Sequence, residues 1–175
     1  MDEKRSSHKW PLSARGRQRC LALAAALEKY QPDIFIASEE RKAQETANII
    51  SLHHGKAYET VENLHEQRRE YENIVSVHEF KEKIADLFRY PDQIKFGSET
   101  ANAARDRFTA AVKMTVAQYP QKTLAIVSHG VVMSLFIASH ANMDPHEVWY
   151  QMGLPAYAAF SLPDYELIEY NSTLL

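Results

Sequence analysis

The sequence has little of what marks several large protein classes. Its 175 residues include 5 glycines and neither GxGxxG nor GxxxxGK[ST], which excludes the common glycine-rich nucleotide loops. Lysine and arginine total 20 against 23 aspartates and glutamates, so no nucleic-acid partner is expected. No apolar run approaches the roughly 18 residues of a membrane span, and no signal-peptide pattern is present. The single cysteine, Cys20, cannot form an internal disulfide and fits a reducing, cytoplasmic compartment.

What is present is an alternation of strands and helices. Short β-branched and aromatic runs predict strands at 34–37, 57–61, 123–127, 156–162 and 166–170, the last two as a hairpin. Apolar spacing and breakers predict helices at 14–29, 39–53, 77–89, 99–119, 131–139 and 145–149. This order predicts a three-layer α/β/α sandwich with a mostly parallel sheet, as a single domain over residues 1–175. Residues 63–97 carry weaker signals, and we interpret them as a lid insertion.

The triplet Ser128-His129-Gly130 joins the strongest strand to a helix. In open α/β sheets, ligands bind at the carboxyl ends of the strands. The helix that follows offers free backbone N–H groups and the positive end of its dipole, which favour an anion such as phosphate. Gly130 would let the backbone approach that anion closely. The alternative is a histidine that is simply held at a strand end by hydrogen bonds.

A second strand-to-helix junction lies at 37–47. Glu39 and Glu40 suit the positive end of a helix, whereas the cations Arg41 and Lys42 do not. A bound anion would explain these two cations. A pair with Glu39 or Glu45 would explain them equally well.

Other candidate sites have weaker support. The charged stretch 64–70, taken alone, predicts a solvated surface. The histidines outside residues 65 and 129 lack the spacing of metal ligands, so no metal is expected. The absence of a GxSxG elbow argues against a serine hydrolase.

Four stretches, taken in order, resemble the histidine phosphatase (phosphoglycerate mutase-like) superfamily. They are PLSARG at 11–16, ASEERKAQETA at 37–47, LHE at 64–66 and VSHG at 127–130. VSHG is fairly specific and the second stretch moderately so, while the other two count mainly through their order. Together they cover nearly all of the chain from Trp10 onward.

The resemblance implies phosphoryl transfer through a phosphohistidine, which requires no cofactor. It assigns His129 as the second, phosphate-stabilising histidine and Glu66 as the general acid. A carboxyl in that role would need a raised pKa. Lys42 falls where the family usually has a phosphate-binding arginine, and Arg41 could replace it if the helix start shifted. The expected phosphate-binding residues are therefore Lys42, Arg41, Ser128 and Gly130.

The family's first strand, which carries the nucleophilic histidine in Leu-x-Arg-His-Gly or -Ser, is not found in this sequence. His8 lies in a polar segment with no strand before it, so we do not interpret it as the nucleophile. We therefore expect an N-terminally truncated phosphomonoesterase acting on a small phosphorylated substrate or a phosphoprotein. The alternatives are a non-catalytic phosphate-binding relative and, with less support, a mutase.

Overall fold

The chain alternates helices and strands as the sequence predicts. The structure is a computed structural model that describes residues 9–69 and 76–174. Its elements are α1 (Ala14–Leu27), η2 (Glu28–Tyr30), β1 (Ile34–Ser38), α2 (Arg41–His53), β2 (Tyr58–Val61), α3 (Val77–Arg89), α4 (Ala101–Gln118), β3 (Leu124–Val127), α5 (Gly130–Ala141), α6 (Pro145–Gln151), β4 (Tyr157–Ser161) and β5 (Glu166–Asn171). No helix among these is both long and apolar enough to cross a membrane.

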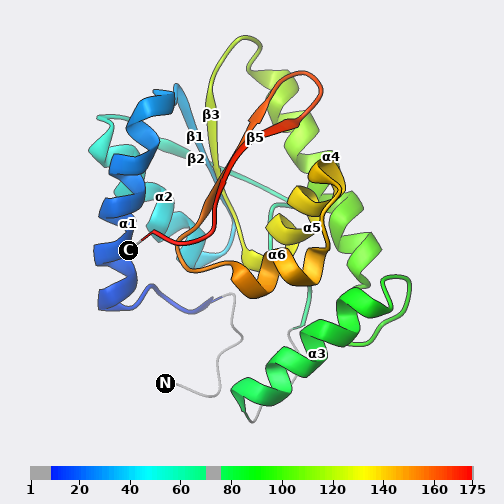
Figure 1. Ribbon diagram of the computed structural model, residues 1–175. Coiled ribbons are helices and arrows are strands. Elements are labelled where there is room, and N and C mark those ends of the chain that lie inside the picture. Colours follow the sequence, from blue (N-terminus) through cyan, green and yellow to red (C-terminus); the bar gives the residue numbers. More distant parts are fainter. Residues whose placement is uncertain (1–8, 70–75, 175) are drawn as a thin grey trace.

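β1 lies at the centre of a three-stranded parallel sheet. The strand order is β2-β1-β3, and Phe35 pairs with Tyr58 on one side and with Ala125 on the other. Successive β1 residues face opposite cores, because Phe35 packs with α1 and α2 whereas Ile36 packs with α4 and α5. Figure 1 shows these helix pairs on opposite sides of the sheet. The predicted three-layer α/β/α sandwich is confirmed.

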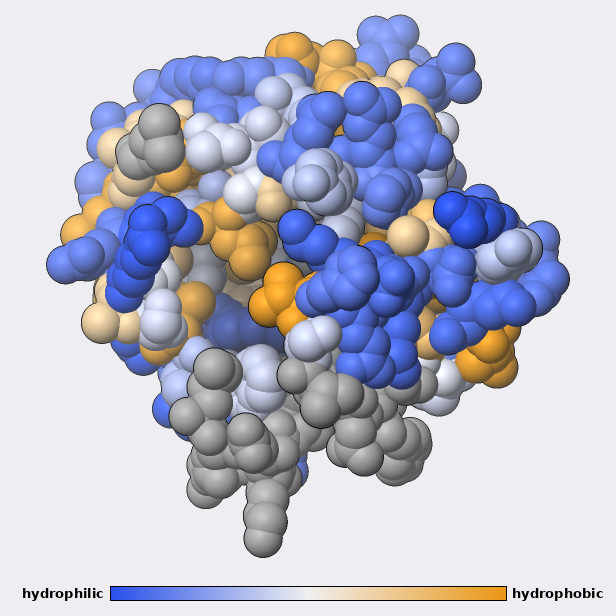
Figure 2. All heavy atoms as spheres, turned by 60° about the horizontal axis from the view of Figure 1, so that its bottom comes forward, coloured by the Kyte–Doolittle hydropathy of each residue, from blue (hydrophilic) through white to orange (hydrophobic). Residues whose placement is uncertain are grey.

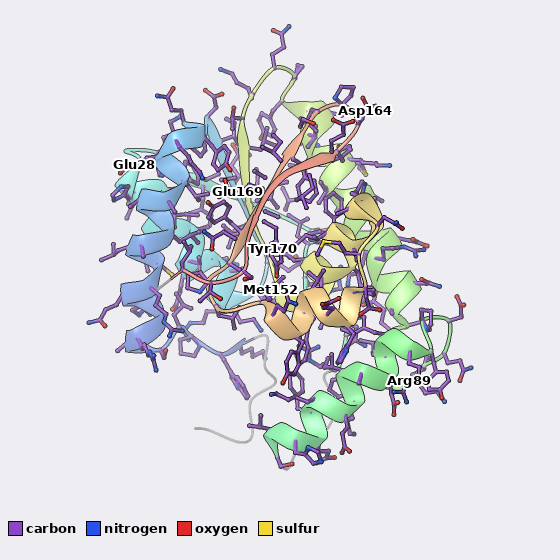
Figure 3. The ribbon with its side chains drawn as sticks, viewed as in Figure 1. Glu28, Arg89, Met152, Asp164, Glu169 and Tyr170 are labelled. Atoms are coloured by element: carbon purple, nitrogen blue, oxygen red, sulfur yellow. The ribbon has the colours of Figure 1, made fainter. Side chains whose placement is uncertain are left out.

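β4 and β5 form a separate antiparallel hairpin. Neighbouring β5 residues fasten it to different parts of the fold. The Glu169 carboxylate accepts hydrogen bonds from Lys29, at 2.6 Å, and from the hydroxyl of Tyr30. The Tyr170 hydroxyl donates to the backbone oxygen of Val148 in α6 at 3.0 Å. Figure 3 labels Glu169 and Tyr170 on the hairpin, between α1 and α6.

β3 differs from β1 in pairing and in burial. Within the described ranges, β3 pairs with β1 alone, and the hairpin does not join the sheet. Its residues 124–127 are all half-buried, whereas β1 residues 35–38 are all buried. Over residues 9–69 and 76–174, the outer edge of β3 therefore has backbone groups that no strand pairs.

The segment interpreted as a lid contributes α3, which lies at one end of the molecule (Figure 1) and contacts α6. Ile84 and Leu87 of α3 are fully buried in the larger core. Residues 70–75 of this segment lie outside the described part of the chain. The lid interpretation stays a prediction.

Candidate active site

Two strand ends bring Ser38 and His129 together at the carboxyl edge of the sheet. β1 and β3 are parallel with Ala37 opposite Val127, so the residues that follow are neighbours. Ser38 Oγ lies 2.8 Å from His129 Nε2. His129 is the N-cap of α5 but makes no side-chain cap bond, so its ring serves this contact instead. Figure 2 turns this end of the molecule toward the viewer and shows a hollow in it.

His129 is almost completely buried, with 3% of its side chain exposed. Its Nε2 lies 3.7 Å from Oε1 of Glu40. Burial lowers the pKa of His129 to about 4, and the carboxylates of Glu40 and Glu66 offset only part of that effect. The imidazole is therefore neutral at pH 7, and a phosphate dianion placed beside it would favour the protonated, cationic form.

Glu66 is held against the N-terminus of α5. Its carboxylate accepts hydrogen bonds from the backbone N–H groups of Val131 at 3.0 Å, Val132 at 3.2 Å and Gln67 at 3.0 Å. The guanidinium of Arg69 lies 3.5 Å from Oε2. Two of the free amides in the first turn of α5, which the sequence offers to an anion, thus bind a carboxylate of the chain itself.

The acidity of Glu66 differs from the expectation. Burial raises the pKa of this carboxyl, but Arg69, His129 and the backbone amides together outweigh burial and hold the pKa below its usual value. The raised pKa expected of a general acid is therefore not found in this arrangement. Three amide donors and a guanidinium stabilise the ionised form, which is the physical reason for the difference.

Glu40 is a site residue that the sequence reasoning missed. It precedes α2 as its N-cap, yet its carboxylate turns inward and is 8% exposed. Oε1 accepts the backbone N–H of Glu66 at 2.9 Å, and Oε2 lies 3.0 Å from Lys42 Nζ. Burial raises the pKa of Glu40, but His129 and Lys42 outweigh it and the pKa is lowered. A glutamate just after a buried strand was the signal, and it was interpreted only as a favourable helix charge.

The two cations of the second junction take different places. Lys42 joins the cluster through Glu40 and keeps 31% of its side chain exposed. Arg41 is 55% exposed and donates from Nε to Glu45 at 2.9 Å, on the side of α2 where Arg17 also pairs with Glu45. The pairing alternative therefore describes Arg41, while Lys42 is the cation near His129.

Ser128 and Gly130, which flank His129, contact other parts of the chain. The Ser128 hydroxyl donates to the backbone oxygen of Leu64 at 2.7 Å and so fixes the start of the segment that carries Glu66. At Gly130, a Cβ would lie 3.7 Å from the indole of Trp149, an ordinary contact. The structure therefore brings His129, Glu66, Lys42, Ser128 and Gly130 together and leaves Arg41 outside.

The prediction of a solvated surface for 64–70 is wrong for most of its described residues. Leu64 is fully buried and Gln67 is 2% exposed. Only 13% of the Arg69 side chain is exposed, because the guanidinium lies against two phenylalanine rings from residues distant in sequence. The sequence of the charged stretch does not predict this contact, because the two phenylalanines lie elsewhere in the chain. Glu70 lies outside the described residues.

The charges of the site are balanced within the chain. A buried neutral imidazole lies between two ionised carboxylates, each of which is neutralised by one cation. In the part of the chain that the structure describes, no three metal-ligating side chains gather into one group.

The structure is thus an α/β protein whose parallel sheet carries a buried histidine, two carboxylates and two cations at its carboxyl edge. The sequence matches the histidine phosphatase superfamily (branch 1) over residues 3–168, and the chain belongs to that family. It is 27% identical over 145 residues to an uncharacterized phosphatase, PhoE, of Bacillus subtilis (strain 168), covering 77% of this chain and 67% of that one.

Solved structures share the fold. A phosphoserine phosphatase from Entamoeba histolytica superposes with a TM-score of 0.75 at 20% identity, covering 97% of this chain and 88% of that one. A mycobacterial glucosyl-3-phosphoglycerate phosphatase gives a TM-score of 0.75 at 17% identity, covering 97% and 90%. These structures show the fold, and the family match together with the PhoE relative supports a phosphatase-type function for the chain.

Proposed function

We propose that this chain provides most of the active site of a phosphomonoesterase that works through a phosphohistidine. The observation that carries the proposal is the buried His129 at the carboxyl edge of the sheet, beside Glu66 and within 3.7 Å of Glu40. His129 stabilises the equatorial phosphate oxygens once it is protonated, and Lys42 contributes positive charge.

The nucleophilic histidine, in this proposal, is carried by a further strand that pairs with the outer edge of β3. The unpaired edge of β3 and its half-buried residues 124–127 support this placement. A parallel strand there would end beside His129, since the carboxyl ends of parallel strands meet at one edge. His8 lies outside the described residues and is not assigned this role.

The reaction then has two steps. The nucleophilic nitrogen attacks phosphorus, the bond from phosphorus to the ester oxygen breaks, and Glu66 gives its proton to the departing oxygen. Water next attacks phosphorus and gives a proton to Glu66, the phosphorus–nitrogen bond breaks, and inorganic phosphate and the free histidine are released. A phosphate dianion beside Glu66 would favour its protonated form, which reconciles its low pKa at rest with the acid role. Small phosphate monoesters and phosphoproteins both remain within this substrate class.

A non-catalytic phosphate-binding protein is the second candidate. It is favoured by one observation: within residues 9–69 and 76–174, no second histidine side chain contacts His129. Such a protein would bind phosphate with the same cluster and release no product.

Turnover of p-nitrophenyl phosphate separates the two candidates. We would compare the 175-residue chain with a chain extended by the residues encoded upstream of Met1, each with and without His129→Ala. The phosphatase proposal expects activity in the extended chain and a loss of at least about 1000-fold in its His129→Ala variant. An in-frame stop before any Leu-x-Arg-His strand, with phosphate binding intact, would favour the binding protein. Absence of both turnover and phosphate binding would refute both.

A further inference from the structure

Arg69 is a buried arginine that the reaction described above does not use. Its guanidinium carbon lies 5.4 Å from the ring centre of Phe80 in α3 and 5.5 Å from that of Phe96. These distances are typical of cation–π contacts, which strengthen when the cation is desolvated. The two rings themselves meet edge to face at 5.9 Å. The guanidinium thus lies against one ring of α3 and one of the loop before α4, donates from Nη1 to Gln67 Oε1 at 3.4 Å, and points its Nη2 at the carboxylate of Glu66.

The backbone beneath Arg69 is fixed equally closely. The backbone N–H of Ser98 donates to the oxygen of Arg68 at 2.8 Å. Gly97 has φ +74°, and a Cβ built on it would lie 2.0 Å from that oxygen and 2.7 Å from Cα of Arg69. Only glycine permits this approach. The loop that contains Phe96 therefore locks the backbone of residues 68 and 69 in place.

The charged groups around Glu66 come from three helices and the segments that precede them. From α5 come the N-cap residue His129 and two amides, and from the start of α2 comes Glu40 with its partner Lys42. Arg107 of α4 donates to the backbone oxygen of Glu66 at 3.3 Å, but its charge is matched by Glu99 at 2.9 Å. Arg69 is thus the cation whose guanidinium is directed at the Glu66 carboxylate itself.

We propose that Arg69 is a positioning residue for Glu66: packed against the adjoining rings of Phe80 and Phe96, it holds the Glu66 carboxylate against the amides of Val131 and Val132 in α5 and controls when that carboxyl takes up a proton. The inference rests on the proposed function only in giving Glu66 the acid role. Phe80 also links α3 to the site. Its ring centre lies 5.9 Å from that of Trp149 in α6, and Trp149 lies beside Gly130.

The protonation of Glu66 can be followed directly by carbon NMR of chains labelled at the glutamate carboxyl carbons. Glu66→Gln identifies the signal, and its midpoint is then measured in the wild type and in Arg69→Met. Removing the guanidinium should raise the midpoint by about one pH unit or more, a tenfold gain in proton affinity. Arg69→Lys keeps the charge without the planar stacked group and should fall between the two. Arg68→Met, a neighbouring exposed arginine with the same substitution, is the matched control and should not move the midpoint.

A folded Arg69→Met variant that titrates like the wild type would overturn the proposal, as would an equal shift in Arg68→Met. If the methionine variant does not fold, Arg69→Gln retains a planar polar group and supplies the same readout, and an unchanged midpoint there overturns the proposal as well. No turnover is needed, so this result is independent of the phosphatase test. In an active extended chain, where Glu66 must be protonated to act as the acid, Arg69→Met should also move the alkaline limb of the pH–rate profile to higher pH.

Discussion

Two glutamates flank the same buried histidine, and their surroundings differ. Glu40 has one backbone N–H and a lysine whose side chain is 31% exposed. Glu66 has three backbone N–H groups and an arginine that is packed against two adjoining rings and is 13% exposed. Both carboxyls have lowered pKa values despite burial: His129 and then Lys42 lower the pKa of Glu40, whereas Arg69 and then His129 lower that of Glu66. The lysine beside Glu40 can turn toward solvent. The arginine and the backbone amides beside Glu66 are held in place by the surrounding structure.

The difference separates two tasks within one site. A lysine at the solvent edge can exchange its carboxylate partner for a phosphate, because its ammonium group is a mobile point charge. A carboxylate bound by fixed donors keeps one orientation, which proton transfer requires. Substitutions that act on one glutamate and spare the other test this division.

The largest expected contrast is between Glu66→Gln and Glu40→Gln. Glu66→Gln leaves Arg69 buried without its counter-charge, so we expect the free energy of unfolding to fall by about 4 kcal/mol. Glu40→Gln releases a half-exposed lysine to solvent and should cost about 1 kcal/mol. Urea denaturation at pH 7 measures both, and equal losses would contradict the comparison.

Acid should weaken the fold through His129 before it reaches the two glutamates. The pKa of His129 is lowered to about 4 from a usual 6.5, so the folded state binds fewer protons than the unfolded chain between these values. Stability should therefore decline as pH falls from 6.5 to 4, by on the order of 3 kcal/mol. The lowered carboxyl pKa values add a further loss only below their usual range near 4.5. Urea midpoints between pH 7 and 4 measure the decline, and His129→Gln should remove the part above pH 4.5.

Gly97→Ala should disturb the Glu66 side alone. The added Cβ meets the backbone of Arg68 and Arg69, so a loss of about 2–3 kcal/mol is expected. Gly55→Ala is the matched control, since Gly55 also has a positive φ, +66°, but has no atom within 4 Å of a Cβ. It should cost about 1 kcal/mol, for backbone strain only. Thermal or urea unfolding of the two variants checks the difference, and equal costs would mean that the close approach at Gly97 is not a constraint.

Lys42→Arg should give the smallest change, on the Glu40 side. A guanidinium offers a planar pair of donors to phosphate where lysine offers a point charge. We expect inorganic phosphate to bind about 3-fold more tightly. Isothermal titration calorimetry measures this, with Lys122→Arg at an exposed position as the control. Unchanged binding, as in the control, would place Lys42 outside the phosphate site.

The sequence predicted the elements and the edge of the sheet where the site lies. Buried strands and helix starts are local patterns, so the placement of His129 followed from the strand and helix on either side of it. The inward orientation of the Glu40 side chain could not be predicted, because a glutamate before a helix gives the same sequence pattern whether its carboxylate is exposed or buried. The burial of Arg69 depends on its contacts with Phe80 and Phe96, which are distant in sequence and which only tertiary packing brings to it.

Binding of inorganic phosphate at His129 tests the central claim most directly. The ring signals of His129 in the 175-residue chain would be followed by NMR during a phosphate titration at several pH values, with His78, 84% exposed on α3, as the reference. The account expects His129 alone of the two to shift saturably and its pKa to rise from about 4 when phosphate is bound. Unchanged His129 signals at saturating phosphate, or equal shifts of His129 and His78, would contradict it.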